Sequence, residues 1–194
     1  LSTWFRDYLY IPLGGSRGGT WLRVRNTFAI FLVSGFWHGA NWTFIIWGAL
    51  NAIYFLPLLL TNNNRKNLGI VSENRLFPSF RDVFAMLATF WLTAFAWIFF
   101  RAESLSHAFN YIFRIFSKSF FDSPSFSGKL DVLILLCLIT IFIIVEWIGR
   151  KDKFAIQSIG LNWKAPIRNF MYYLIIFVIF YFSGEEQQFI YFQF

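Results

Sequence analysis

Long apolar runs constrain the fold of this chain more than any other feature. Trp42–Leu60, Val83–Phe100 and Leu130–Ile148 are long enough to cross a bilayer as helices. Shorter runs occur at Asn26–Trp37 and Phe170–Phe182, and the first could cross only with its flanks or as half of a re-entrant pair. We therefore expect an all-α, polytopic transmembrane helical bundle with about four to five membrane segments.

The composition argues against an ordinary soluble domain. Hydrophobic residues make up 57% of the chain and charged residues only 14%, which is too little polar surface to cover a soluble fold of this length. The chain opens at Leu1 without a signal-peptide pattern. We expect residues 1–194 to be the C-terminal portion of a single, longer transmembrane domain.

Two further segments lie between the third and fourth apolar runs. Ser104–Phe116 places apolar residues at helical spacing beside polar ones, which predicts an amphipathic helix on the membrane surface or packed at the interface. Asp122–Gly128 is rich in Ser and Pro and predicts a turn that leads into the next span.

The distribution of charge predicts a topology. Most of the 17 basic residues lie in three places. They precede the run that begins at Asn26, follow the run that ends at Leu60, or lie between the runs that end at Ile148 and begin at Phe170. If all five runs cross, the positive-inside rule puts Leu1 in the cytoplasm and Phe194 outside, whereas a re-entrant first pair leaves the number of crossings open. Orientation and membrane lipid with anionic headgroups account for the net charge of +7, and no nucleic-acid signature is present.

His38 is the strongest candidate for a functional residue. It lies in the segment Ser34–Ala40, between apolar runs. An ionisable group at membrane depth costs roughly 2 to 3 kcal/mol, so such groups tend to face a cavity or a partner and to mark function. A core histidine held by hydrogen bonds is the other interpretation.

The neighbours of His38 allow weaker inferences. Gly35 and Gly39 would let a helix or a substrate approach closely, or would only pack helices. Asn41 could orient the imidazole or cap the following helix. Nearby tryptophans could line the site or anchor the chain at the interface: Trp37, Trp42 and Trp47.

Other motifs favour structural roles. The glycine-rich segment Gly14–Gly19, with Arg17, could cradle phosphates but lacks the context of a P-loop, so a flexible turn is the better interpretation. Arg101 with Glu103 is typical of a snorkelling arginine paired with a carboxylate, and His107 is typical of a surface histidine. The spacing of His, Cys, Asp and Glu predicts no metal site.

Several sequence blocks together resemble the membrane-bound O-acyltransferase family, most closely its alginate-type bacterial branch. The likeness covers essentially the whole chain. The blocks are Trp4–Gly19 (WFRDYLYIPLGGSRGG), Ser34–Gly48 (SGFWHGANWTFIIWG), Thr89–Ser104 (TFWLTAFAWIFFRAES) and Phe189–Phe194 (FIYFQF). A second functional polar residue of the family lies upstream of the first block and outside this chain.

The resemblance implies an enzyme of the bacterial cytoplasmic (inner) membrane. Such an enzyme moves an acyl group from a cytoplasmic thioester donor, acetyl-CoA in this branch, toward an extracytoplasmic polysaccharide hydroxyl, with no bound cofactor. His38 matches the catalytic histidine of the family. A neutral imidazole can take a proton from a hydroxyl and return it to a thiolate, because its ordinary pKa lies near 6.5.

The resemblance also implies a periplasmic or extracytoplasmic acetyl-transfer partner protein. Two other functions stay open at this point. The chain could transfer D-alanine or another acyl group to a wall polymer, or it could be a non-catalytic membrane transporter or scaffold. The donor distinguishes the two enzymes, because acetyl-CoA favours polysaccharide acetylation and an acylated carrier protein favours the wall polymer.

Overall fold

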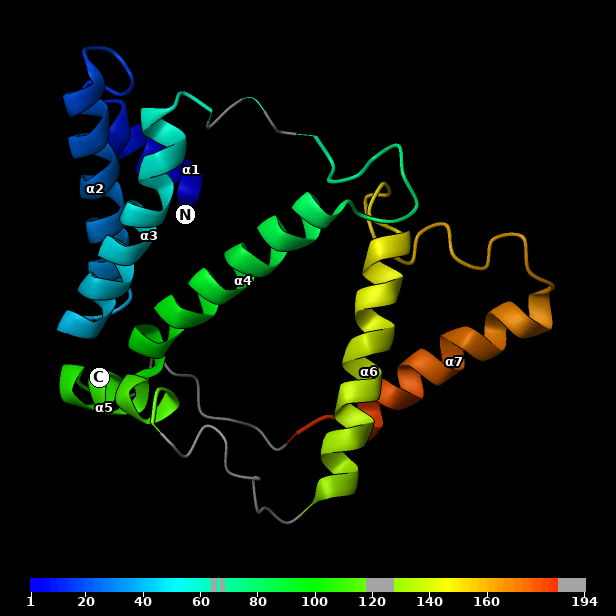
Figure 1. The fold of residues 1–194 in the computed structure, drawn as a ribbon. Coiled ribbons are helices and arrows are strands. Elements are labelled where there is room, and N and C mark those ends of the chain that lie inside the picture. Colours follow the sequence, from blue (N-terminus) through cyan, green and yellow to red (C-terminus); the bar gives the residue numbers. More distant parts are fainter. Residues whose placement is uncertain (64–65, 67–68, 118–127, 185–194) are drawn as a thin grey trace. The chain divides into compact units, whose positions relative to one another are not determined.

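A computed structural model describes residues 1–63, 66, 69–117 and 128–184. Within these ranges every regular element is a helix, which confirms the all-α fold class (Figure 1). The expected turn at Asp122–Gly128, apart from Gly128, and the tail block Phe189–Phe194 lie outside the described residues. The chain divides into two compact units, residues 1–125 and 126–194. A single domain for the whole chain stays a prediction.

The predicted helices are present, and the apolar runs of the sequence lie within or close to the bounds of the observed helices. Three helices, α3, α4 and α6, are long and apolar enough to cross a membrane, and α7 is a shorter apolar helix. The elements are α1 Ser2–Phe5, the π-helix η1 Arg6–Tyr10, α2 Thr20–Trp37, α3 Trp42–Leu60, α4 Phe80–Arg101, α5 Leu105–Ile115, α6 Lys129–Ile148 and α7 Ala165–Tyr181.

Side-chain caps explain where three of the helices begin. Ser79 forms a capping box with Asp82 at the start of α4, and Ser104 accepts a hydrogen bond from the backbone N–H of His107 at the start of α5. Asn41 caps α3 in the same way. These side chains satisfy backbone donors that have no partner inside the helix. The amphipathic segment is therefore a capped helix, as its pattern predicted.

Helix α2 begins at Thr20, ahead of the apolar run Asn26–Trp37, so the helix includes the polar flank of that run. Arg23 donates to the side chains of Asn62 at 2.8 Å and Thr20 at 3.2 Å, and Arg25 donates to the carbonyl of Leu13 at 3.1 Å. The polar first turns are thus stabilised by hydrogen bonds, two of them to other segments of the chain. The length of the apolar run alone does not include these polar first turns.

Helices α2 and α3 pack with their backbones in close contact (Figure 1). A Cβ atom on Gly35 would overlap the carbonyl oxygen of Phe44, and one on Gly48 would overlap that of Phe31. The same position on Gly48 lies 3.5 Å from the Cα of Gly35. Small residues at a helix crossing permit this approach in a membrane protein. The packing interpretation of Gly35 is confirmed.

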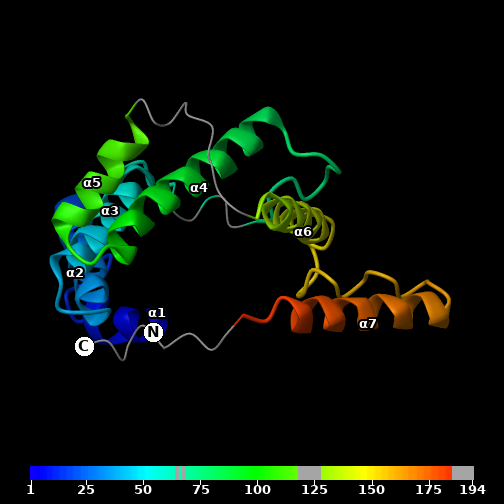
Figure 2. The same ribbon diagram turned by 90° about the horizontal axis from the view of Figure 1, so that it is seen from below.

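Among the described residues, all buried hydrophobic and polar side chains lie in the first unit, and the second unit buries only Gly149 and Gly160. These side chains come from the N-terminal segment and from α2 to α5, and in both views α3, α5 and the end of α4 lie together (Figures 1 and 2). In the second unit, α6 and α7 bury none of their residues. The buried side chains therefore come from the elements on either side of the turn that contains His38.

Candidate active site

His38 directly follows α2, where the chain turns back toward α3. Its backbone N–H donates to the carbonyl of Gly35 at 3.0 Å, and that of Gly39 donates to Phe36 at 3.1 Å, which closes the helix end. Gly39 has a φ of 156°, a conformation that favours glycine. The short turn places the imidazole beside the first turns of α3, where its side chain is half-buried.

Aromatic rings from two other helices surround the imidazole. The ring centroid of His38 lies 5.4 Å from that of Trp47 and 6.4 Å from that of Phe44, both in α3. Phe100, near the end of α4, lies 5.2 Å away. Phe100 also lies 5.1 Å from both Phe44 and Trp47, so the rings form one His38 aromatic cluster. Edge-to-face contacts of this kind stabilise a fixed ring arrangement.

The three tryptophans near His38 have different surroundings in the structure. Trp47 belongs to the His38 aromatic cluster. Trp37 instead packs against Trp4 and Phe5, at centroid distances of 6.3 and 6.5 Å. Trp42 is 71% exposed, as expected of an interfacial anchor. Of the three tryptophans, only Trp47, in the second turn of α3, contacts the His38 ring.

Asn41 connects the His38 turn to a distant part of the chain. Its side-chain oxygen accepts a hydrogen bond from the backbone N–H of Thr43 at 3.1 Å, which confirms the predicted cap. Its amide nitrogen donates to the backbone carbonyl of Glu103 at 3.0 Å. Glu103 follows α4, three residues after Phe100. One side chain therefore holds the turn against the element that supplies the Phe100 ring.

Sequence reasoning missed the contributions of Phe100 and Glu103. Both lie in the block Thr89–Ser104, whose resemblance to a family was the one available signal. Their apolar or backbone contacts with His38 and Asn41 join residues far apart in the chain, so no local pattern reveals them.

The glycine-rich segment is a turn whose carbonyls are engaged by α2. Gly14, Gly15, Gly18 and Gly19 all have positive φ, which L-residues rarely adopt. The fully buried Asn26 donates its amide to the carbonyls of Leu13 at 3.1 Å and Gly15 at 3.0 Å. The turn interpretation is confirmed, although side-chain hydrogen bonds hold the turn in place. Asn26 was not singled out in the sequence.

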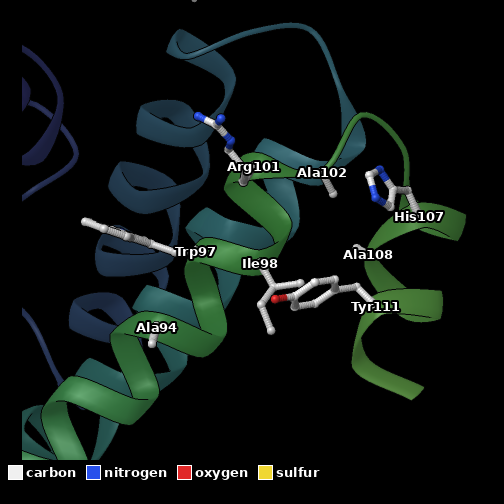
Figure 3. A pocket seen from close by; sticks show the side chains of 8 residues that line it. All are labelled: Ala94, Trp97, Ile98, Arg101, Ala102, His107, Ala108 and Tyr111. Carbon is white, nitrogen blue, oxygen red and sulfur yellow. The ribbon is translucent and has the colours of Figure 1, made fainter. Parts of the chain in front are cut away.

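Arg101 and His107 lie beside a pocket between α4 and α5 (Figure 3). The predicted pairing of Arg101 with Glu103 is wrong, because no ion pair or hydrogen bond joins the two within the described chain. His107 is exposed, as predicted. Among the described residues, no group of His, Cys, Asp and Glu is arranged to hold a metal ion.

The chain belongs to the membrane-bound O-acyltransferase family. Residues 1–90, which include His38 and all of α2 and α3, match the family model. A relative in Pseudomonas putida, named probable alginate O-acetylase AlgI, is 32% identical over 100% of this chain and 41% of its own length. The protein of that name in Pseudomonas aeruginosa is 41% identical over 86% of this chain and 29% of its own.

A peptidoglycan O-acetyltransferase of Helicobacter pylori is 41% identical over 56% of this chain and 19% of its own length. The chain thus spans less than half the length of these curated relatives. No solved structure matches it significantly. Together with the apolar helices, the family establishes an integral membrane protein.

Proposed function

We propose that the whole protein is an O-acyltransferase of the bacterial inner membrane, which moves an acetyl group from cytoplasmic acetyl-CoA toward an extracytoplasmic polysaccharide hydroxyl. The names of the alginate and peptidoglycan relatives support an acetyl group and a glycan acceptor. An extracytoplasmic partner protein would receive the acetyl group or complete its transfer to the polysaccharide.

His38 is the proton-transfer residue in this proposal. The neutral imidazole takes the proton of the accepting hydroxyl while the hydroxyl oxygen forms a bond to the thioester carbonyl carbon. When the tetrahedral intermediate collapses, the carbon–sulfur bond breaks, and the imidazolium returns the proton to the thiolate. The ester and the free thiol of CoA are the products. No metal ion or bound cofactor is needed for these steps.

The observation that carries the proposal is the fixed position of His38. The histidine lies in a short turn, within ring contact of Trp47 and Phe100. Asn41 holds that turn to the chain after α4. General acid–base catalysis requires a base held within reach of the reacting hydroxyl, and a packed aromatic wall limits competing water. A scaffold or transporter has no need of this arrangement.

The cluster also supports the predicted topology. His38 lies between the end of α2 and the start of α3, and it contacts Phe100 near the end of α4. The positive-inside rule predicts that these helix ends share the outward side of the membrane. In this orientation the site is reached by the acceptor from outside, and the acyl donor approaches through the missing part of the domain.

The test uses the full-length protein with His38→Ala, and Tyr54→Phe as the matched control. Tyr54 is a half-buried residue of α3 outside the His38 aromatic cluster. O-acetyl on the surface polysaccharide and the rate with acetyl-CoA in proteoliposomes are measured at equal membrane abundance. We expect a loss of about 10²- to 10⁴-fold for His38→Ala and little change for Tyr54→Phe. Unchanged acetylation in His38→Ala would overturn the catalytic role.

A wall polymer is the second candidate acceptor, because the Helicobacter pylori relative is named a peptidoglycan O-acetyltransferase. The same proteoliposomes distinguish the donors. Transfer from acetyl-CoA supports O-acetylation, whereas transfer only from an acylated carrier protein supports D-alanyl or related acyl transfer.

A further inference from the structure

A pocket of about 330 Å³ lies between the last turns of α4 and the first turns of α5. Its volume falls in the lower range of small-molecule sites. It lies on a different face of α4 from Phe100, which is absent from its lining. The residues that line it are Ala94, Trp97, Ile98, Arg101, Ala102, His107, Ala108 and Tyr111 (Figure 3).

Two polar side chains of this α4–α5 pocket lie toward one end, and the Tyr111 hydroxyl lies beside Ile98 (Figure 3). Figure 3 shows Arg101 and His107 where α4 passes into α5, and Ala94 further back along α4. Ile98 and the fully buried Ala108 lie between these ends. The guanidinium and the imidazole therefore belong to the end of the pocket where α4 passes into α5, and the Tyr111 hydroxyl is the polar group nearer the middle. An amphiphile with a polar head and an apolar chain matches this arrangement.

The charge at the polar end favours an anion. Arg101 contributes a permanent positive charge, and the His107 imidazole can donate a hydrogen bond. No carboxylate lines the pocket. Within the described part of the chain, the Arg101 guanidinium has no carboxylate partner. Its charge is thus available to a ligand.

The position of the pocket matches the headgroup region of a bilayer. The apolar helix α4 is long enough to span the membrane and ends at Arg101. Trp97 and Tyr111 are 63% and 53% exposed, and aromatic residues of this kind concentrate at membrane interfaces. The exposed Phe113 of α5, and Phe116 directly after it, favour a helix lying in the interface.

We propose that the α4–α5 pocket binds an acidic phospholipid. The lipid phosphate accepts hydrogen bonds from Arg101 and His107, and the glycerol end and first part of an acyl chain lie along Ile98 and Ala94. A guanidinium is suited to phosphate through paired hydrogen bonds. The site is distinct from the His38 aromatic cluster and does not depend on the proposed acyl transfer.

The experiment uses the full-length protein in phosphatidylcholine nanodiscs that contain a small fraction of photoactivatable phosphatidylglycerol. After illumination, labelled peptides are identified by mass spectrometry. The variants are Arg101→Gln, which removes the charge, and Ala94→Phe, which fills the apolar end. Arg81→Gln is the matched control, because Arg81 is an exposed basic residue at the other end of the same helix.

We expect labelling of the peptides that carry residues 94–111, and roughly fivefold less of it in Arg101→Gln, since a basic residue near an anionic surface contributes about that factor. Ala94→Phe should also reduce labelling, Arg101→Lys should retain most of it, and Arg81→Gln should leave it unchanged. Millimolar glycerol phosphate should not compete, because it lacks the apolar chain.

Several results would overturn the proposal. Competition by glycerol phosphate would mean a soluble phosphate ligand instead of a lipid. Equal reduction in Arg101→Gln and Arg81→Gln would mean a general effect of surface charge. Absence of labelling at the pocket in the unaltered protein would mean that another segment of the full-length chain fills it.

Discussion

The two units of the chain have similar apolar helices but use them differently. In residues 1–125, α2 and α3 bring their backbones into contact at Gly35 and Gly48, and a buried amide holds a turn. In residues 126–194, α6 is the most apolar of the candidate spans, yet none of its residues is buried. Hydropathy alone therefore predicts membrane insertion in both units, but does not predict close packing.

Residue size explains this difference. Without a hydrophobic driving force between helices in lipid, association depends on close backbone approach and on hydrogen bonds. α2 and α3 supply glycine, serine, threonine and asparagine, whereas α6 contains no glycine, alanine or serine. A helix that is apolar all round is suited to contact with hydrocarbon. The site lies in the unit whose sequence permits close packing.

The largest expected effect is the loss of the buried amide in Asn26→Leu. This change removes the hydrogen bonds that the amide donates to the carbonyls of Leu13 and Gly15, and the two that its oxygen accepts from Arg25. We expect the free energy of unfolding of the full-length protein to fall by about 3 kcal/mol. Thr140→Val in α6 is the control, because its exposed hydroxyl bonds only within its own helix. Unfolding by SDS titration measures both, and equal losses would break the contrast between the units.

A smaller effect is expected where only a methyl group is added. In Gly35→Ala the new Cβ overlaps the carbonyl of Phe44, so α2 and α3 must separate, at a cost of about 2 kcal/mol. Cys137→Leu adds more volume to α6 but lies at an exposed position, so its effect should stay within about 0.5 kcal/mol. The same titration compares them. A large loss in Cys137→Leu would show that α6 packs as tightly as α3 in the whole protein.

The smallest change in the free energy of unfolding is expected from Asn41→Ser, which should instead lower kcat. Serine retains an oxygen that caps α3 but loses the amide that donates to Glu103. The unfolding free energy should change by less than about 0.5 kcal/mol, while kcat falls roughly tenfold because His38 is less well positioned. KM for acetyl-CoA should stay the same.

Ser104→Ala is the control for this measurement. It removes the cap of α5 without affecting the Asn41 contacts, and it should cost about 1 kcal/mol of stability with kcat per folded protein unchanged. A normal kcat in Asn41→Ser would restrict Asn41 to capping.

Local patterns predicted much of the fold. Trp42–Leu60 was predicted with the bounds of α3, and Ser104 marked the start of α5. Predictions failed where a residue depends on a partner outside its own segment. The apolar run Asn26–Trp37 did not show where α2 begins, because the hydrogen bonds of Arg23 and Arg25 to other segments are not a local signal. Arg101 was paired with its neighbour Glu103, but no ion pair or hydrogen bond joins them in the described chain.

The sequence by itself determined an all-helical membrane protein and singled out His38, because apolar length, basic loops and an isolated imidazole are properties that can be read along the chain. Only the tertiary structure decided what surrounds that histidine. Phe100 contacts its ring and Glu103 accepts a hydrogen bond from Asn41, although both lie two helices and one loop further along the chain. Such contacts depend on how closely helix backbones approach, and Gly35 and Gly48 set that approach for α2 and α3.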